Sequence, residues 1–135
     1  MAYAQWVTIT ILPDNCDVVL KNFQLDWGKF YAPNNKDAEI DKNTLENYQV
    51  KKEIPYSISS CGREDASSGT EGSFNVCDDQ GQQICNIYWD CPWGSSTNTF
   101  KVSSINTGYM VDYSGDNLDG GALGTVTVEI FKKYA

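Results

Sequence analysis

Residues 6–12 read WVTITIL, and from Val7 to Ile11 apolar and hydroxyl-bearing side chains alternate. Val7, Ile9 and Ile11 fall on one face of an extended chain, while Thr8 and Thr10 fall on the other. A period of two residues is typical of a β-strand that has one buried face and one wet face. The stretch therefore predicts a strand near the N-terminus, and antiparallel sheets suit its alternation.

Short runs of the same kind recur along the whole chain and are separated by turn residues. In the last of them, Val126, Val128 and Ile130 alternate with polar neighbours. Eight or more short strands at such spacing are typical of a β-sandwich or a β-barrel. A chain of 135 residues favours one domain, so we expect a single all-β domain over residues 1–135. The other runs cover residues 17–25, 48–54, 56–60, 72–77, 83–89, 100–103 and 109–113.

Turn signals pair some of these runs. Strand-like runs flank Gln80-Gly81, and others flank residues 106–108, so we expect a hairpin at each place. Residues 37–47 have room for one turn of helix but are polar throughout most of their length. We find no internal repeat and no linker.

The charge balance of the chain excludes several kinds of partner. It has 10 basic and 18 acidic residues, which gives a formal net charge of −8. Both nucleic acid and anionic lipid attract proteins through a basic face. We therefore expect no nucleic-acid partner, and any membrane target should carry little net charge. Recognition should then depend on aromatic and hydrogen-bonding contacts.

The sequence contains no histidine. This removes the usual general base and the commonest zinc ligand. Asp112, Asp116 and Asp119 do not have the spacing of a calcium-binding EF-hand, because the twelfth position counted from Asp112 is Leu123. We therefore expect a non-enzymatic protein with no catalytic residues, metal or cofactor. A hydrolase that uses carboxylates alone is the remaining enzymatic alternative.

Cysteine usage and the first residues bear on the cellular compartment. The five cysteines contain no CxxC pair, and buried free thiols are their expected state, with a Cys77–Cys85 disulfide as the alternative. The start MAYAQWV has neither a basic region nor an apolar core of a secretory signal. We expect synthesis in the cytosol, a leaderless route for any release, and a peripheral position on target membranes.

Residues 88–94 read YWDCPWG and are the least ordinary stretch of the chain. Trp89 ends an apolar run and is expected mainly in the core. Trp93 lies in a Pro/Gly turn, where an indole has little core to enter, and is expected to be an exposed aromatic anchor. Trp6 and Trp27 stay open between packing and binding. Arg63, in a loop of small residues, is expected to pair with a carboxylate rather than with a ligand.

These stretches resemble the aegerolysins, a family of small acidic proteins mostly from fungi and some bacteria. The run WDCPWG is rare by itself, and the matching stretches follow one another in order over almost the whole chain. They are residues 2–7 (AYAQWV), 27–29 (WGK), 36–39 (KDAE), 61–63 (CGR), 65–66 (DA), 69–70 (GT), 88–94 (YWDCPWG), 97–98 (TN), 113–115 (YSG), 117–119 (NLD) and 121–125 (GALGT).

The resemblance implies a β-sandwich like that of the actinoporin cytolysins. It also implies binding to sphingolipid membranes, namely sphingomyelin with cholesterol or ceramide phosphoethanolamine, and a pore-forming partner with the perforin (MACPF) fold. Both lipids carry almost no net charge, in agreement with the acidic composition. The lipid-contacting positions of the family fall here on Trp6, Trp27, Tyr88, Trp93 and the loop that contains Ser68.

The chain departs from the family pattern at two loop positions. Familiar members carry Glu where this chain has Ser68 and Lys where it has Ser96, which leaves lipid preference and cholesterol dependence open. A lectin-like, carbohydrate-binding β-sandwich is the alternative function, because exposed Trp and Tyr residues suit sugars as well as lipids. The family motifs favour the lipid.

Overall fold

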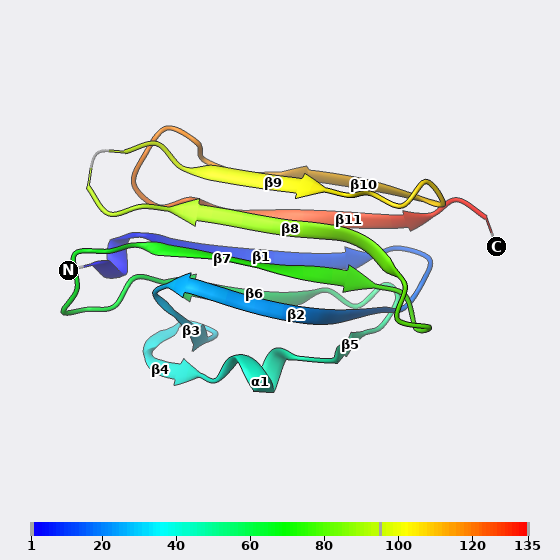
Figure 1. Ribbon diagram of the computed structural model, residues 1–135, viewed down its shortest axis with the longest axis horizontal. Helices are drawn as coiled ribbons and strands as arrows, with labels where there is room; N and C mark the ends of the chain where they lie inside the picture. The colour runs from blue at the N-terminus through cyan, green and yellow to red at the C-terminus, as the bar shows by residue number, and fades with distance from the viewer. Residues whose placement is uncertain (1, 95, 135) are drawn as a thin grey trace.

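The computed structural model describes residues 2–94 and 96–134 as two β-sheets packed face to face (Figure 1). One sheet has six strands in the order β10-β11-β1-β6-β3-β4, and the other has five in the order β5-β2-β7-β8-β9. The predicted all-β sandwich is therefore confirmed. The strands are β1 (Trp6–Pro13), β2 (Val18–Trp27), β3 (Lys29–Ala32), β4 (Asn35–Ile40), β5 (Tyr48–Val50), β6 (Tyr56–Cys61), β7 (Thr70–Cys77), β8 (Gln83–Cys91), β9 (Thr99–Ser103), β10 (Tyr109–Ser114) and β11 (Gly124–Lys132). A 3-10 turn, η1 (Ala2–Ala4), precedes them, and the expected turn of helix is α1 (Lys42–Leu45).

The alternation of β1 sets the inner face of the six-stranded sheet. Val7, Ile9 and Ile11 are at most 1% exposed and lie between β11 and β6, whereas Thr8 and Thr10 face outward. Burying an aliphatic side chain of this size stabilises the fold by roughly 1.5–3 kcal/mol. The strand predicted over residues 6–12 is confirmed.

Aromatic rings fill the core between the sheets at one end. Phe23 stacks on Phe74 at 4.8 Å between ring centroids, and Phe30 meets Trp89 edge-on at 6.1 Å. Trp89 is 0% exposed, as its position at the end of an apolar run predicts. The packing of the four rings ties β2, β3, β7 and β8 into one unit.

The hairpin expected around residues 106–108 is wrong. β9 pairs with β8 in the five-stranded sheet, whereas β10 pairs with β11 in the six-stranded sheet. The connecting residues cross from one layer to the other, and Asn106 donates its backbone N–H to the Ile84 carbonyl on the way. β9 and β10 meet through side chains instead, with Phe100 and Tyr113 at 5.2 Å between ring centroids. Each strand forms its ladder with a longer neighbour, which uses more of its backbone groups.

The sheets are mainly antiparallel, as expected, but β1 and β11 run parallel from Val7↔Gly124 to Pro13↔Ile130. The hairpin around Gln80-Gly81 is confirmed as β7 and β8. A bulge near its turn places Cys77 opposite Gln83, while Cys85 faces Val76, and the alternative disulfide is not formed. Burial raises the pKa of the Cys85 thiol to about 12.

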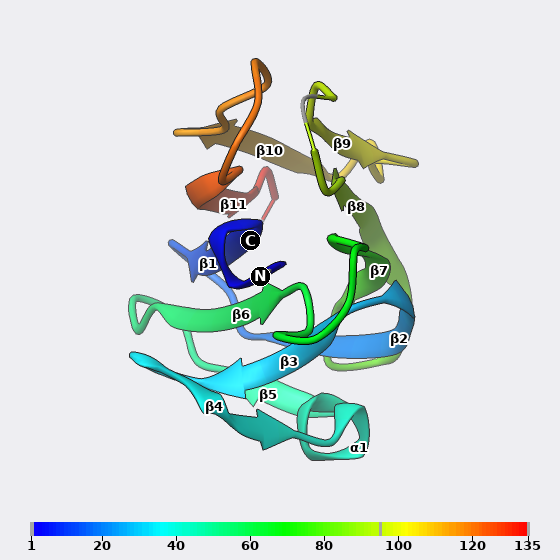
Figure 2. The ribbon, with the colours of Figure 1, turned by 90° about the vertical axis from the view of Figure 1, so that its left-hand side faces the viewer.

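Connections gather at the two ends of the sandwich. The β2–β3 turn, the β6–β7, β8–β9 and β10–β11 loops and η1 lie at the left end in Figure 1, which faces the viewer in Figure 2. We refer to this as the loop end. The β1–β2 and β7–β8 turns and the C-terminus lie at the opposite end. Three of the predicted site residues, Trp27, Ser68 and Trp93, belong to connections or strand ends at the loop end.

Candidate functional site

Trp27, Ser68 and Trp93 line one open pocket of about 330 Å³ at the loop end. We call it the indole pocket; Glu71 and Asp90 also line it. Trp27 is 58% exposed and Trp93 is 43% exposed, so neither indole is used to fill the core. The structure thus places Trp93 at the surface, as its Pro/Gly turn predicts, and settles the open choice for Trp27 in favour of exposure.

Close backbone contacts hold the walls of the indole pocket. Gly28 has a φ of +91°, and a Cβ there would lie 2.5 Å from the Cys61 carbonyl oxygen. A Cβ at Gly69 would collide with the Cys91 carbonyl. Only glycine permits both approaches. The β2–β3 turn, the β6–β7 loop and the end of β8 are therefore packed against one another before any ligand arrives.

Two carboxylates stand beside the indoles. Trp27, Glu71 and Asp90 are neighbours in one row across β2, β7 and β8, on the outer face of the five-stranded sheet. Burial, and the nearby charge of Glu71, raise the pKa of Asp90. Among the residues that the structure describes, neither carboxylate forms an ion pair. The pocket therefore combines aromatic faces with uncompensated negative charge.

Glu71 and Asp90 are not among the site residues predicted from the sequence, although the sequence carries a signal for them. A hairpin centred on Gln80-Gly81 makes partners of positions whose numbers add to 161, and Glu71 and Asp90 are such a pair. Their alternation with buried Thr70 and Trp89 places both on the outer face.

Tyr88 lies one row farther from the loop end and does not line the indole pocket. Its hydroxyl donates a hydrogen bond to Glu71. Burial first, and then the carboxylate of Glu71, raise the pKa of Tyr88, so the phenol stays protonated at neutral pH. Tyr88 therefore contributes to the pocket by orienting Glu71.

Trp6 lies apart from the other predicted residues, on the outer face of the six-stranded sheet. Its ring is partly buried, and the Lys36 ammonium lies 5.6 Å from the ring centroid. With Tyr3, Tyr31 and neighbouring polar residues it lines an open groove of about 800 Å³, which we call the Trp6 groove. The structure thus brings together three of the five predicted residues and separates Trp6 and Tyr88 from them.

A buried chain of hydrogen bonds runs beneath the indole pocket. Trp89 Nε1 donates to Thr70 Oγ1 at 3.0 Å, and Thr70 shares a 2.6 Å bond with the hydroxyl of Ser60. Ser60 donates in turn to the backbone carbonyl of Lys29 at 2.8 Å. Buried polar groups are costly unless they are satisfied. These hydrogen bonds therefore fasten β3, the strand that follows the Trp27 turn, to β6, β7 and β8.

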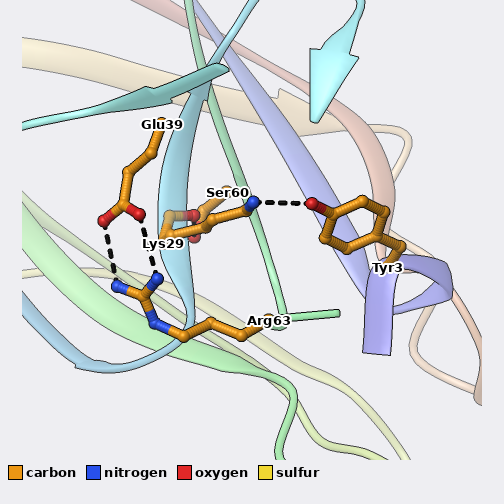
Figure 3. Close-up of polar contacts among 5 residues, drawn as sticks. All are labelled: Tyr3, Lys29, Glu39, Ser60 and Arg63. Carbon is orange, nitrogen blue, oxygen red and sulfur yellow. Dashed lines mark hydrogen bonds and ion pairs between the residues drawn. The ribbon is translucent and has the colours of Figure 1, made fainter. Parts of the chain in front are cut away.

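A second network fastens the loops at the edge of the six-stranded sheet (Figure 3). Arg63 forms two 2.9 Å hydrogen bonds with Glu39, and Lys29 donates to the Tyr3 hydroxyl at 2.7 Å. The Arg63 guanidinium lowers the pKa of Glu39. The expected carboxylate partner of Arg63 is therefore confirmed, and the pair joins β4 to the β6–β7 loop.

Comparisons with known proteins point to one family. The family model described as Aegerolysin matches residues 4–133. Ostreolysin A6 of Pleurotus ostreatus is 50% identical over 98% of this chain and 99% of its own length. Asp-hemolysin of Aspergillus fumigatus is 45% identical over 98% of this chain and 96% of its own length.

A solved structure has the same fold. The crystal structure of IP-1A from Alcaligenes faecalis superposes with a TM-score of 0.91 at 39% identity, over 98% of this chain and 94% of that one. Within residues 2–94 and 96–134, no helix has the length and apolar character that crossing a membrane requires.

Proposed function

The chain belongs to the aegerolysin family, and on that premise we propose that it is a membrane-binding protein that recognises a zwitterionic sphingolipid headgroup in the indole pocket. The headgroups in question are those of sphingomyelin, in membranes with cholesterol, and of ceramide phosphoethanolamine. We further propose that the bound protein recruits a perforin-like partner that forms a cytolytic pore. This chain would select the target membrane, and the partner would form the pore.

The observation that carries the proposal is the pairing of two exposed indoles with two carboxylates in one pocket. Both headgroups carry a positively charged nitrogen. Such a cation is attracted to the face of an indole, and a carboxylate adds a direct charge interaction. Glu71 and Asp90 would hold the nitrogen, while the headgroup phosphate would stay at the rim, away from the two negative charges.

Trp27 and Trp93 also suit the boundary between lipid and water, because an indole has an apolar body and a hydrogen-bonding N–H. The loop end would therefore face the membrane, and the protein would sit peripherally on it. Ser68 lies in this pocket where familiar family members carry Glu, so Glu71 and Asp90 would supply the negative charge that the loop lacks.

Vesicle binding tests the proposal. We expect sedimentation with vesicles of sphingomyelin and cholesterol or of ceramide phosphoethanolamine, and little with phosphatidylserine vesicles. Trp93→Ala should lower the affinity at least tenfold while the melting temperature changes by only a few degrees, since the Trp93 side chain is exposed and lies outside the core. Phe131→Ala, which removes an exposed ring near the C-terminus, is the matched control and should bind normally.

The outcome that contradicts the proposal is strongest binding to phosphatidylserine, or unchanged binding by Trp93→Ala. A loss of stability of roughly 3–5 kcal/mol in Trp93→Ala, typical of a core aromatic residue, would show instead that the indole is structural.

Dye release separates binding from pore formation. The strands of this chain are already hydrogen-bonded into two sheets around a filled core. We therefore expect the protein alone, at saturating coverage, to bind sphingolipid vesicles without releasing encapsulated calcein. Addition of a perforin-like protein should produce release. Rapid and complete release by this chain alone would contradict the proposed division of roles.

A further inference from the structure

We propose that the Trp6 groove is a second binding site, which takes a neutral saccharide of the hexose type. The groove lies on the outer face of the six-stranded sheet, whereas the indole pocket lies on the five-stranded one. The inference does not depend on the function proposed for the indole pocket.

The groove is large enough for a sugar and is built from five parts of the chain. Its volume is about 800 Å³, and its walls come from η1, β1, the β3–β4 hairpin, β6 and β11. Tyr3 and Trp6 contribute partly buried rings, and the buried Tyr31 borders the floor. A sugar ring has a face of C–H groups that packs on such rings, and aromatic packing of this kind is favourable beyond the area it buries.

The polar groups of the groove match hydroxyls rather than ions. Thr8 and Ser59 share a 2.9 Å hydrogen bond across β1 and β6, and the Tyr31 hydroxyl is hydrogen-bonded to both. Ser57, farther along β6, shares a 2.9 Å hydrogen bond with Thr10. Each hydroxyl has one donor and two acceptor positions, so these groups keep acceptor capacity for the hydroxyls of a ligand. Asn34 and Asn35 add amides, which both donate and accept. This is the set of groups that a ring of sugar hydroxyls requires.

The lining of the groove contains a cation as well as a carboxylate, which distinguishes it from the indole pocket, where the two charged lining residues are both acidic. Lys36 donates to the Tyr3 carbonyl at 2.6 Å, and Asp37 accepts from the Tyr3 hydroxyl at 2.8 Å. A phosphate would meet the nearby carboxylate of Asp37, and a cation would meet Lys36. An alkyl chain would cover the unused hydrogen-bonding positions of the hydroxyls and amides and offer them no partner, which is unfavourable. A neutral polar ligand avoids all three costs.

The same contacts prepare the groove for a ligand. Tyr3 receives a hydrogen bond from Lys29 (Figure 3) and donates one to Asp37, so η1 is joined to both β3 and β4. A wall that is already ordered loses little conformational freedom on binding. Because Trp6 pairs with Cys61 at the end of β6, and Tyr3 belongs to η1, one end of the groove lies at the loop end. A sugar on the membrane that carries the sphingolipid would therefore be within reach.

Two sources offer this chemistry, a glycolipid headgroup and a glycan free of lipid. Nitrogen-15 NMR titration with methyl β-glucoside, methyl β-galactoside and lactose tests the lipid-free source. Sedimentation with glucosylceramide vesicles, compared with ceramide vesicles, tests the glycolipid. We expect at least one of these saccharides to shift the Trp6 indole N–H and the amides of Ser57 and Lys36, or glucosylceramide to enhance sedimentation.

Variants assign the effect to the groove. Trp6→Ala should reduce saccharide affinity at least tenfold, and Tyr31→Phe, which removes only a hydroxyl and keeps the ring, should reduce it severalfold with an unchanged fold. Trp93→Ala is the matched control, because it alters the indole pocket and should leave saccharide binding intact. Its loss of sphingolipid binding with saccharide binding retained would show that the two sites are separate.

The proposal is overturned if none of the three soluble saccharides shifts groove resonances and glucosylceramide vesicles bind no better than ceramide vesicles. It is equally overturned if the shifts persist unchanged in both Trp6→Ala and Tyr31→Phe. Neither result would affect the function proposed for the indole pocket, which is tested with other lipids and other variants.

Discussion

The indole pocket and the Trp6 groove both join aromatic rings to polar groups, but they differ in how their charges are balanced. The lining of the groove contains one cation, Lys36, and one carboxylate, Asp37, whose charges offset each other. The lining of the indole pocket contains two carboxylates, Glu71 and Asp90, and no basic side chain among the residues that the structure describes. Two like charges predict a ligand of the opposite sign, whereas offsetting charges predict a neutral ligand. The comparison therefore assigns the two aromatic sites to different chemistry.

The largest effect is expected from removing the core that supports the pocket. Trp89→Ala deletes a ring that is 0% exposed, and it leaves the Thr70 hydroxyl without its indole partner. We expect a loss of roughly 3–5 kcal/mol in the free energy of unfolding, measured by urea denaturation. The variant should lose sphingolipid binding together with its fold.

Thr70→Val is a milder companion to that variant, because it keeps the volume and removes only the hydroxyl that joins Trp89 to Ser60. We expect a cost of about 1–3 kcal/mol for the two groups left unsatisfied. Unchanged stability in both variants would show that the buried chain does not hold the pocket in place.

A smaller effect, confined to binding, is expected from the carboxylates. Glu71→Gln and Asp90→Asn keep the shape of each side chain and remove its charge. Each should weaken binding to zwitterionic sphingolipid vesicles severalfold, and the double variant should weaken it further. Asp37→Asn, which removes a charge from the Trp6 groove, is the control and should not change sphingolipid binding. Equal losses in all three variants would remove the distinction between the two sites.

The dependence of sphingolipid binding on pH, on the acidic side, should reflect the titration of Asp90. Because the pKa of Asp90 is raised in the folded protein, its negative charge is lost at a higher pH than in a free aspartate. Binding should therefore fall as the pH drops through that raised pKa, and Asp90→Asn should flatten this part of the curve.

Stability should change in the opposite direction in the same pH window. The folded state holds this proton more tightly than the unfolded state, so the contribution of Asp90 to stability rises as the pH falls. Parallel loss of binding and of stability on acidification would mean that unfolding, and not titration of the pocket, governs the curve.

Local patterns account for what the sequence predicted well. The alternation in residues 6–12 fixes an inner and an outer face without any knowledge of neighbouring strands, and the Pro92 and Gly94 turn keeps Trp93 out of the core. The hairpin of β7 and β8 also follows from adjacent residues. The lipid-contact roles of Trp6, Trp27, Ser68, Tyr88 and Trp93 stay predictions.

Long-range pairing accounts for what the sequence did not predict. A short connection between β9 and β10 permits either a hairpin or a crossing between layers, and the choice depends on β8 and β11, which lie elsewhere in the chain. The separation of Trp6 from Trp27 likewise follows from their places in different sheets. Neither fact is encoded within a single strand.

The smallest effect is expected from salt. A protein with a net charge of −8 releases no counterions from a lipid surface that is itself nearly neutral. The attraction in the indole pocket acts at contact distance, where screening by salt is weak because ions of the solution cannot come between the partners. Binding to sphingomyelin and cholesterol, or to ceramide phosphoethanolamine, should therefore be nearly the same at low and at physiological ionic strength.

Vesicle sedimentation at several salt concentrations, with a polybasic peptide on phosphatidylserine vesicles as the positive control, checks this expectation. The peptide should lose its binding as salt rises, since its affinity depends on an anionic surface. A steep loss for this chain as well would mean that long-range charge, and not the indoles with Glu71 and Asp90, brings it to the membrane. Binding that is independent of salt in the original protein and is lost in Trp93→Ala would place the affinity in the indole pocket, because the charges elsewhere on the chain are the same in both proteins.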